Sequence, residues 1–430
     1  MDPTIERVFL PPSSHSTTVT RFQLPVGSGT LLGRTLSLEI ALENERATNW
    51  WVPRAGGYAL IDRIQILRNG EELSFLNYVG AYAALKAGVY DAEESERLEA
   101  KTGGALLADV PDLGVQGDVA GVACANHIVS YTAAIEDLPV SQKGRPLLPL
   151  HVILDLFHAN SLIDLGDDRW EIIITWLSVG GVQPCQTIAG GTAAAIMRPS
   201  ANCRLIYSVA SRMGQTPVRQ DLGKAPGRIA TELRPWMEVR TTNAVVASNV
   251  SPPSLVDGAA DSQSIPIRFS NVKASGLFMA FLDTTAGTTF NSLNVAHGIC
   301  YSRPISTSTY NLNVVVNGNA IYPRAITQDS ERLMELCVAS NILAGGTGGP
   351  GTSFGIPLGG GAKNIYTWTR GHSAIGAGRM CYYGFRLTED GQPIQLNSEG
   401  IYLQLQRNAL VGGATPALTC IAFLLGPKSM

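Results

Sequence analysis

The 430-residue sequence predicts an all-β fold that contains the same β-domain twice. Three observations predict it: apolar residues mostly alternate with polar ones, Asn-Gly, Gly-Gly and Pro-Gly steps recur between the alternating runs, and one ordered set of elements occurs twice. Glycine (45) and proline (24) together contribute 69 residues, so the chain is rich in turns. With 45 % hydrophobic residues the chain can bury a sizeable core, which excludes global disorder.

The charge content is low for a chain of this size. Charged residues make up 16 %, below the roughly 25 % usual for soluble domains. The formal net charge is −3, so no basic excess is present that would neutralise nucleic-acid phosphates in bulk. The low charge indicates either that much of the surface lies against something else or that the surface is merely apolar.

Alternation of apolar and polar residues is clearest in three runs, at 62–73, 150–157 and 170–177. Side chains two residues apart share a face of a strand, so each run predicts a strand with one apolar face. Helical patterns are scarce. The two best follow Asn-Gly turns, at 77–90 and 329–343, and predict short helices in the connections.

The repeat is recognised first by its hairpins. Residues 62–73 (DRIQILRNGEEL) align without gaps with 310–321 (YNLNVVVNGNAI) at an offset of 248, so the turn at Asn69 coincides with the turn at Asn317. Asn-Gly between alternating apolar residues is the strongest short hairpin signal, because both residues readily take positive φ. Each hairpin precedes a predicted helix, an irregular stretch and a second strand pair, for which the offset is about 231. This order predicts a duplicated β-domain.

The join between the copies is predicted near residue 215, in the polar, Gly- and Pro-containing stretch 211–228. Residues 1–20 carry no core pattern and are predicted to form an N-terminal arm, which either reaches a neighbouring molecule or is a plain disordered end. The predicted units are therefore 21–215 and 216–430.

Seven scattered cysteines form no CxxC or other zinc spacing. Their placement predicts buried free thiols in a chain that folds in a reducing compartment. The first residues have no apolar signal core, and no stretch approaches the roughly 18 apolar residues of a membrane span. We therefore expect a soluble chain made in the cytosol or nucleus, and glycosylation of the sequon at Asn249 stays open.

Five segments, taken in order, resemble the double jelly-roll major capsid proteins of tailless icosahedral double-stranded DNA viruses. The likeness is nearest to those of large nucleocytoplasmic viruses and virophages, and the adenovirus hexon is more distant. The resemblance spans roughly residues 30–425, with Asn271 and Leu396 where the family usually has Pro and Gly. The segments that carry it are 56–82, 145–174, 264–283, 313–324 and 384–405.

The resemblance implies two tandem eight-stranded antiparallel jelly rolls and a trimer whose six jelly rolls form a pseudo-hexagonal capsomer of an icosahedral shell. It implies a structural virion protein, not an enzyme, assembled in the host cytoplasm or nucleus. Its partners would be its own copies, minor capsid and penton proteins and an underlying membrane, with no sequence-specific nucleic acid. The loops at 91–144 and 342–366 would rise outward as towers.

Two other function classes stay open. A double jelly-roll protein that binds or hydrolyses glycans would need paired carboxylates or stacking aromatic residues, for which the acidic turn around Trp170 is the only hint. A single jelly-roll capsid protein with a protruding domain would lack the repeated order of elements.

We predict no catalytic residue, no cofactor and no metal site. The Gly27-Ser28-Gly29 stretch lacks a phosphate-binding lysine. His151 and His158 flank Asp155, but His151 and Asp155 are expected to lie in a strand as ordinary outward or interface residues. The acidic turn is expected to cap local amides, with a bound cation as the alternative. The members of this turn are Asp164, Asp167, Asp168 and Glu171.

Overall fold

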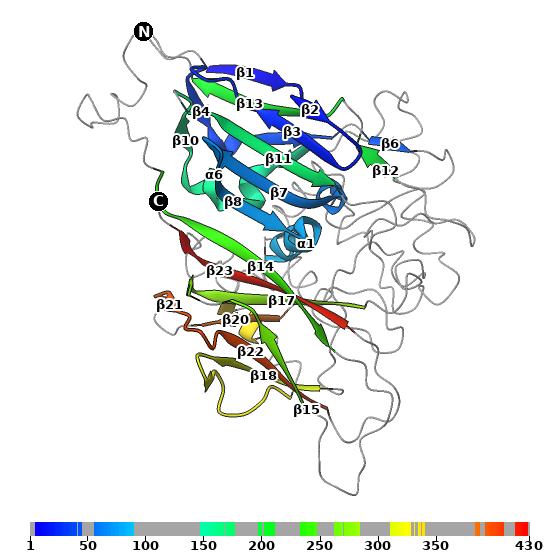
Figure 1. Cartoon of the computed structure of the whole chain (residues 1–430), viewed down its shortest axis with the longest axis vertical. Coiled ribbons are helices and arrows are strands. Elements are labelled where there is room, and N and C mark those ends of the chain that lie inside the picture. The colour runs from blue at the N-terminus through cyan, green and yellow to red at the C-terminus, as the bar shows by residue number, and fades with distance from the viewer. Residues whose placement is uncertain are drawn as a thin grey trace, which may run out of the picture.

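A computed structural model describes the chain as two β-units, one above the other in Figure 1. The described residues are 5–40, 42–44, 56–89, 147–166, 168–176, 197–199, 202–210, 233–246, 262–269, 271–283, 310–327, 331, 334–336, 338–339, 383–387, 392–407 and 418–428. The predicted boundary at 215, the tower loops and Asn249 lie outside them.

The first unit is a sandwich of two antiparallel sheets. One sheet has the order β10-β4-β13-β5-β9, with β1 also paired to β13, and the other has the order β2-β3-β11-β7-β8. The strands of the first sheet are β1 (Ile5–Leu10), β4 (Thr30–Leu32), β5 (Ser37–Glu39), β9 (Leu147–Pro149), β10 (Leu162–Asp164) and β13 (Arg204–Ala210). Those of the second are β2 (Ser14–His15), β3 (Val19–Gln23), β7 (Ile61–Arg68), β8 (Glu71–Asn77) and β11 (Trp170–Trp176), while β6 (Leu42–Asn44) pairs separately with β12 (Met197–Pro199).

Short helices occupy the connections of this unit. They are η1 (Gly33–Thr35), η2 (Gly56–Leu60), α1 (Val79–Val89), α5 (Leu150–Ile153) and α6 (Asp155–Ala159).

The second unit repeats the arrangement with two four-stranded sheets, β14-β23-β17-β20 and β15-β22-β18-β19, and a short pair, β16-β21. Its strands are β14 (Trp236–Val246), β15 (Ser262–Ile267), β16 (Lys273–Ala274), β17 (Gly276–Asp283), β18 (Tyr310–Val316), β19 (Asn319–Ala320), β20 (Tyr383–Arg386), β21 (Ile394–Gln395), β22 (Ile401–Arg407) and β23 (Leu418–Lys428).

The two units have the same connectivity. In chain order, the principal strands of the first unit are β1, β3, β5, β7, β8, β9, β11 and β13, and those of the second are β14, β15, β17, β18, β19, β20, β22 and β23. In both units the first, eighth, third and sixth of these form one sheet, and the second, seventh, fourth and fifth form the other. This order describes an eight-stranded jelly roll. The all-β fold with two tandem jelly rolls is therefore confirmed.

The strand register reproduces the repeat at the level of single residues. Ile172 lies opposite Ile66 in the first unit, and Leu403 lies opposite Val314 in the second. The two offsets between these pairs are 248 and 231, the values that the sequence alignment predicts. All four side chains are buried.

The structure corrects the predicted arm at 1–20. Strand β1 pairs with β13 from Ile5 opposite Ala210 to Leu10 opposite Leu205, and Val8 and Leu10 pack against the core. The first unit therefore begins near residue 5, not 21. The pattern is faint because β1 is an edge strand whose other side chains, including Ile5, are exposed.

The predicted strand at 150–157 is wrong: this segment forms α5 and α6. Leu150, Ile153, Leu154 and Phe157 are all buried. Their spacing of three and four residues fits one face of a helix as well as the alternation fits a strand. The predicted helix at 77–90 is confirmed as α1, and the described residues of 331–339 are helical as expected.

One sheet of the second unit is buried on both faces. Leu277 and Met279 of β17 lie in that unit's own core, whereas Phe278 and Ala280 lie in a core shared with the first unit. We call this shared contact the junction. Strands buried on both faces need continuous apolar runs, and β17 and β23 have them, in GLFMAFLD and CIAFLLG.

Candidate functional site

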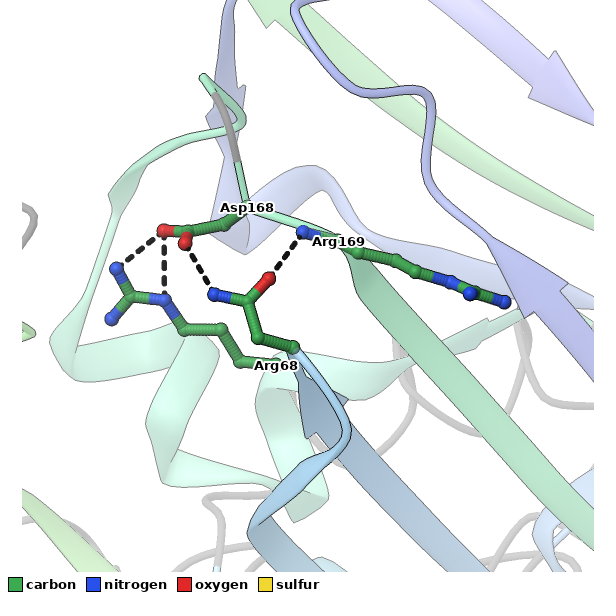
Figure 2. Close-up of polar contacts among 4 residues, drawn as sticks. Arg68, Asp168 and Arg169 are labelled. Atoms are coloured by element: carbon green, nitrogen blue, oxygen red, sulfur yellow. Dashed lines mark hydrogen bonds and ion pairs between the residues drawn. The ribbon is translucent and has the colours of Figure 1, made fainter.

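Polar side chains tie the first hairpin turn to the acidic turn that precedes β11 (Figure 2). The Asp168 carboxylate accepts hydrogen bonds from Nε of Arg68 at 2.8 Å and from Nδ2 of Asn69 at 2.6 Å. Oδ1 of Asn69 in turn accepts a bond from the backbone N–H of Arg169 at 2.8 Å. Asp168 therefore fixes local groups, as expected for a structural turn.

The second unit contains a matching contact. Asn317 has φ of 52° and Asn69 has φ of 54°, so both occupy the left-handed conformation that an Asn-Gly hairpin requires. Oδ1 of Asn317 accepts a bond from the N–H of Asn397 at 2.9 Å, and its Nδ2 donates to the carbonyl of Gln395 at 3.0 Å. The repeated Asn-Gly steps therefore have the same role in both units. In each, the asparagine side chain hydrogen-bonds the hairpin turn to the segment before the seventh strand.

The pKa of Asp168 lies below its ordinary value. Burial raises the pKa, but the hydrogen bonds from Arg68 and Asn69 and the charge of Arg68 together lower it by more than burial raises it. A carboxylate with a lowered pKa stabilises the fold above its unfolded pKa, and this stabilisation is lost as pH falls through the folded value.

Replacing Asp168 by asparagine should lower the free energy of unfolding at pH 7 by about 1–3 kcal/mol, since Arg68 loses a charged partner. The difference from wild type should shrink as the pH falls below about 4. Urea unfolding at several pH values measures this. Glu171→Gln is the matched control, because Glu171 pairs with an Arg21 side chain that is 52 % exposed and should contribute less than about 1 kcal/mol. An Asp168 effect that stays constant down to pH 3 would contradict the argument.

The geometry of the acidic turn around Trp170 does not support a site that binds or hydrolyses glycans. Trp170 is 1 % exposed, and the Arg68 guanidinium carbon lies 5.7 Å from its ring centroid. The Asp168 carboxylate is engaged by Arg68 and Asn69, and Glu171 pairs with Arg21. Neither an open aromatic face nor an unengaged carboxylate pair is therefore present at these residues. Asp167 lies outside the described residues.

His151 lies on α5 and Asp155 on α6, not in a strand as predicted, and His158 also lies on α6. Asp155 accepts a hydrogen bond from the backbone N–H of Met237 at 2.6 Å, so it connects α6 to the second unit. The pKa of His158 is lowered by burial and by the nearby charge of Arg34. Within the described ranges, no three His, Cys, Asp or Glu side chains lie close enough together to hold a metal ion.

The Gly27-Ser28-Gly29 stretch is a turn. The N–H of Gly27 donates to the carbonyls of Leu165 and Gly166 at 2.7 and 2.9 Å, so it is used within the fold. Gly27 and Gly29 both have positive φ.

Cys203 and Cys420 are buried, and the other five cysteines lie outside the described residues. In the described part of the chain, no helix is long and apolar enough to span a lipid bilayer.

The junction joins the second unit to the core of the first unit. Phe423 of β23 is fully buried, with its ring centroid 5.4 Å from that of Tyr82 on α1. Nδ2 of Asn243 donates to the hydroxyl of Tyr78 at 2.8 Å. The sequence contains a signal for this contact, because the unbroken apolar runs of β17 and β23 indicate strands that are buried on both faces. A search for alternating apolar and polar residues does not detect such strands.

Lys428 and Glu238 of the second unit lie at the edge of the junction, where Lys428 contacts the first unit. Nζ of Lys428 donates to the Leu73 carbonyl of the first unit at 2.6 Å and lies 2.5 Å from Glu238. Glu238 is only 5 % exposed and also accepts a bond from Nε of Arg240 at 2.8 Å. A buried carboxylate with two cationic partners is satisfied, and removing either partner would leave charge poorly compensated.

A second surface is exposed, on the outer side of β1 and β13. Its exposed residues are Ile5, Arg7 and Phe9 of β1, and we call it the β1 face. On β13 beside them, Arg204 and Ser208 are partly exposed and Ile206 is buried. Ile5 and Phe9 are 62 % and 50 % exposed. The guanidinium carbons of Arg7 and Arg204 lie 5.5 and 5.3 Å from the Phe9 ring centroid. Arg204 is also paired with Glu39, so the β1 face consists of two exposed apolar side chains beside Arg7 and beside an arginine with a carboxylate partner.

Comparisons with known proteins give a likeness of fold. No family model matches the sequence, and no curated protein matches it. A structure of the Sputnik virophage aligns with a TM-score of 0.53, a model of the PBCV-1 virus capsid with 0.50, and the Faustovirus major capsid protein with 0.50. Each is 10 % identical and covers 99 % of this chain, and 86 %, 94 % and 90 % of those chains respectively are covered. With matching connectivity in both of its units, this chain has the double jelly-roll fold found in these viral capsid structures.

Proposed function

We propose that this chain is the major capsid protein of a tailless icosahedral double-stranded DNA virus. It forms homotrimers, each trimer is a pseudo-hexagonal capsomer of six jelly rolls, and capsomers build the virion shell. The observation that carries the proposal is the pair of jelly rolls with identical connectivity joined by an extensive apolar junction. The capsid structures with this fold, which align over nearly the whole chain, support it.

A structural role suits the physical character of the chain. A tiling protein needs large lateral surfaces, and charged residues are depleted in the cores of such contacts. The charged fraction of 16 % agrees with that need. We further propose that the protein acts through its flanks and not as an enzyme, and that minor capsid and penton proteins and an underlying membrane are its other contacts.

Light scattering on the purified protein should give a mass of about 137 kDa, three times the 45.7 kDa chain. Negative-stain microscopy of the same sample should show particles with six-fold-like outlines. A chain that stays at 45.7 kDa across the micromolar range would contradict the capsomer proposal. Glycan-array binding or glycosidase turnover by the purified chain would favour the glycan alternative instead.

A further inference from the structure

The segment that begins the second unit is held by two side chains of the first unit. Oδ1 of Asn160, the residue after α6, accepts a hydrogen bond from the N–H of Arg234 at 2.7 Å, and its Nδ2 donates to the Arg234 carbonyl at 3.2 Å. The Asp155 carboxylate accepts a bond from the N–H of Met237 at 2.6 Å. Three bonds from one short stretch of the first unit therefore engage the backbone where β14 begins.

These bonds take the place of a neighbouring strand. Among the described strands only β23 pairs with β14, so the other side of β14 is a sheet edge. In an antiparallel ladder, a residue of a hydrogen-bonded pair exchanges both its N–H and its C=O bond with one partner. The Asn160 carboxamide makes these same two bonds with Arg234, so it acts as the partner residue that this edge lacks.

Asn160 is built into the first unit. It is only 5 % exposed, and its Nδ2 also donates to the Leu156 carbonyl at 3.0 Å, so both amide donors and the amide oxygen are used. Trp236 and Val239 of β14 are buried in the core that the second unit shares with the first. The start of β14 is therefore packed as a part of the first unit.

The polar contacts define the orientation of the two units more narrowly than the apolar junction does. Burial of apolar surface is non-directional, whereas a hydrogen bond weakens steeply when donor and acceptor are misaligned. Lys428 of β23, opposite Trp236, adds a further fixed point, since its Nζ donates to the Leu73 carbonyl at 2.6 Å. Figure 1 shows β14 and β23 as the strands of the second unit that lie nearest the first.

We infer that Asn160 and Asp155 are positioning residues that set the orientation of the second unit relative to the first, so that a chain without their bonds folds but does not close the trimer. We call these two side chains the α6 clamp. The inference rests on the proposed homotrimer, because a ring of six jelly rolls closes only when every chain holds its two units at the same angle.

Hydrogen exchange measured by mass spectrometry tests the clamp directly. Asn160→Ala and Asp155→Ala should each speed exchange in peptides that cover 233–239 by about tenfold or more, because the N–H groups of Arg234 and Met237 lose their acceptors. Peptides from β7 and β11 should exchange as in the wild type. Light scattering of the same variants should give a mass near 45.7 kDa in place of the trimer.

Two further variants are controls. Asp155→Asn keeps an oxygen acceptor and should behave as the wild type, whereas the carboxylate also interacts electrostatically with Lys86 of α1. Loss of the trimer in Asp155→Asn would assign the role to that charge and overturn the clamp. Asn397→Ala is the matched control, because Oδ1 of Asn397 accepts bonds from the N–H groups of Glu399 at 2.9 Å and Gly400 at 3.2 Å within the second unit alone. It should remain trimeric.

Thermal unfolding checks that each variant is folded. If Asn160→Ala yields no soluble protein, Asp155→Ala carries the test, since Asp155 is only partly buried. Wild-type exchange at 233–239 in the alanine variants overturns the clamp. Fast exchange in a chain that still forms the trimer overturns the role in orientation and leaves the proposed function standing. A wild type that is itself monomeric contradicts the proposed function, and with it the role of the clamp in assembly.

Discussion

Replacing Phe423 by alanine should lower the free energy of unfolding by about 3–5 kcal/mol, the range for removing a buried aromatic ring. Phe423 is fully buried, contacts Tyr82 of the first unit and lies beside Phe278 in its own sheet. Its loss leaves a cavity between the two jelly rolls, where neither core can close over it. Urea unfolding followed by tryptophan fluorescence measures the change.

A second expectation separates this variant from an ordinary core deletion. Phe281 is equally buried but lies in the second unit's own core, in an edge-to-face contact with Tyr383 at 5.3 Å. Phe281→Ala should destabilise by a similar amount, yet the two units should still unfold together. Phe423→Ala should split unfolding into two transitions, because it weakens the contact that couples them. Val245→Ala, at a 71 % exposed position, should change stability by less than about 0.5 kcal/mol. A Phe423 variant as stable as the Val245 variant would refute the role given to the junction.

Replacing Gly426 by alanine should prevent formation of the native second unit or destabilise it by more than about 4 kcal/mol, an exceptional value for one substitution. A Cβ at this position would lie 1.9 Å from the carbonyl oxygen of Lys273 and 2.9 Å from its carbonyl carbon. Both are backbone atoms of Lys273, the first residue of β16, so movement of a side chain cannot relieve the contact. The yield of soluble protein and the melting temperature measure the effect.

Gly27→Ala is the matched control for this variant. Gly27 has φ of +74°, and no atom lies within 4 Å of the point that an alanine Cβ would occupy there. Alanine at this position therefore meets only the left-handed backbone penalty of about 1–2 kcal/mol. Equal losses of melting temperature in the two variants would show that steric contact at Gly426 is unimportant.

Much of the fold follows from local patterns in the sequence. The Asn-Gly steps at Asn69 and Asn317 fix two hairpins through their backbone conformation, and the alternation in 170–177 fixes β11. These signals work because a two-residue turn and a one-sided strand each depend on a few neighbouring residues. The order of such signals was enough to predict that the unit occurs twice.

Other parts of the structure depend on contacts far along the chain. The first residues form β1 only because β13, some 200 residues later, offers a free edge, so their own pattern is too weak to predict a strand. Residues 150–157 satisfy both the strand and the helix period, and packing against α1 and η1 favours the helices. The candidate surfaces share this limit: an exposed Phe9 between two arginines is a tertiary arrangement, since Arg204 joins it from a distant strand.

The central place of β23 has a consequence for how the protein is made. This strand pairs with both β14 and β17, and one of its faces completes the junction. During synthesis, all strands of the first jelly roll are present once residue 210 has left the ribosome. The second jelly roll cannot complete its sheet until residues 418–428 have been made. A chain that ends before residue 418 would therefore leave β14 and β17 without the strand that lies between them, and chaperones and proteases recognise such unpaired strand edges.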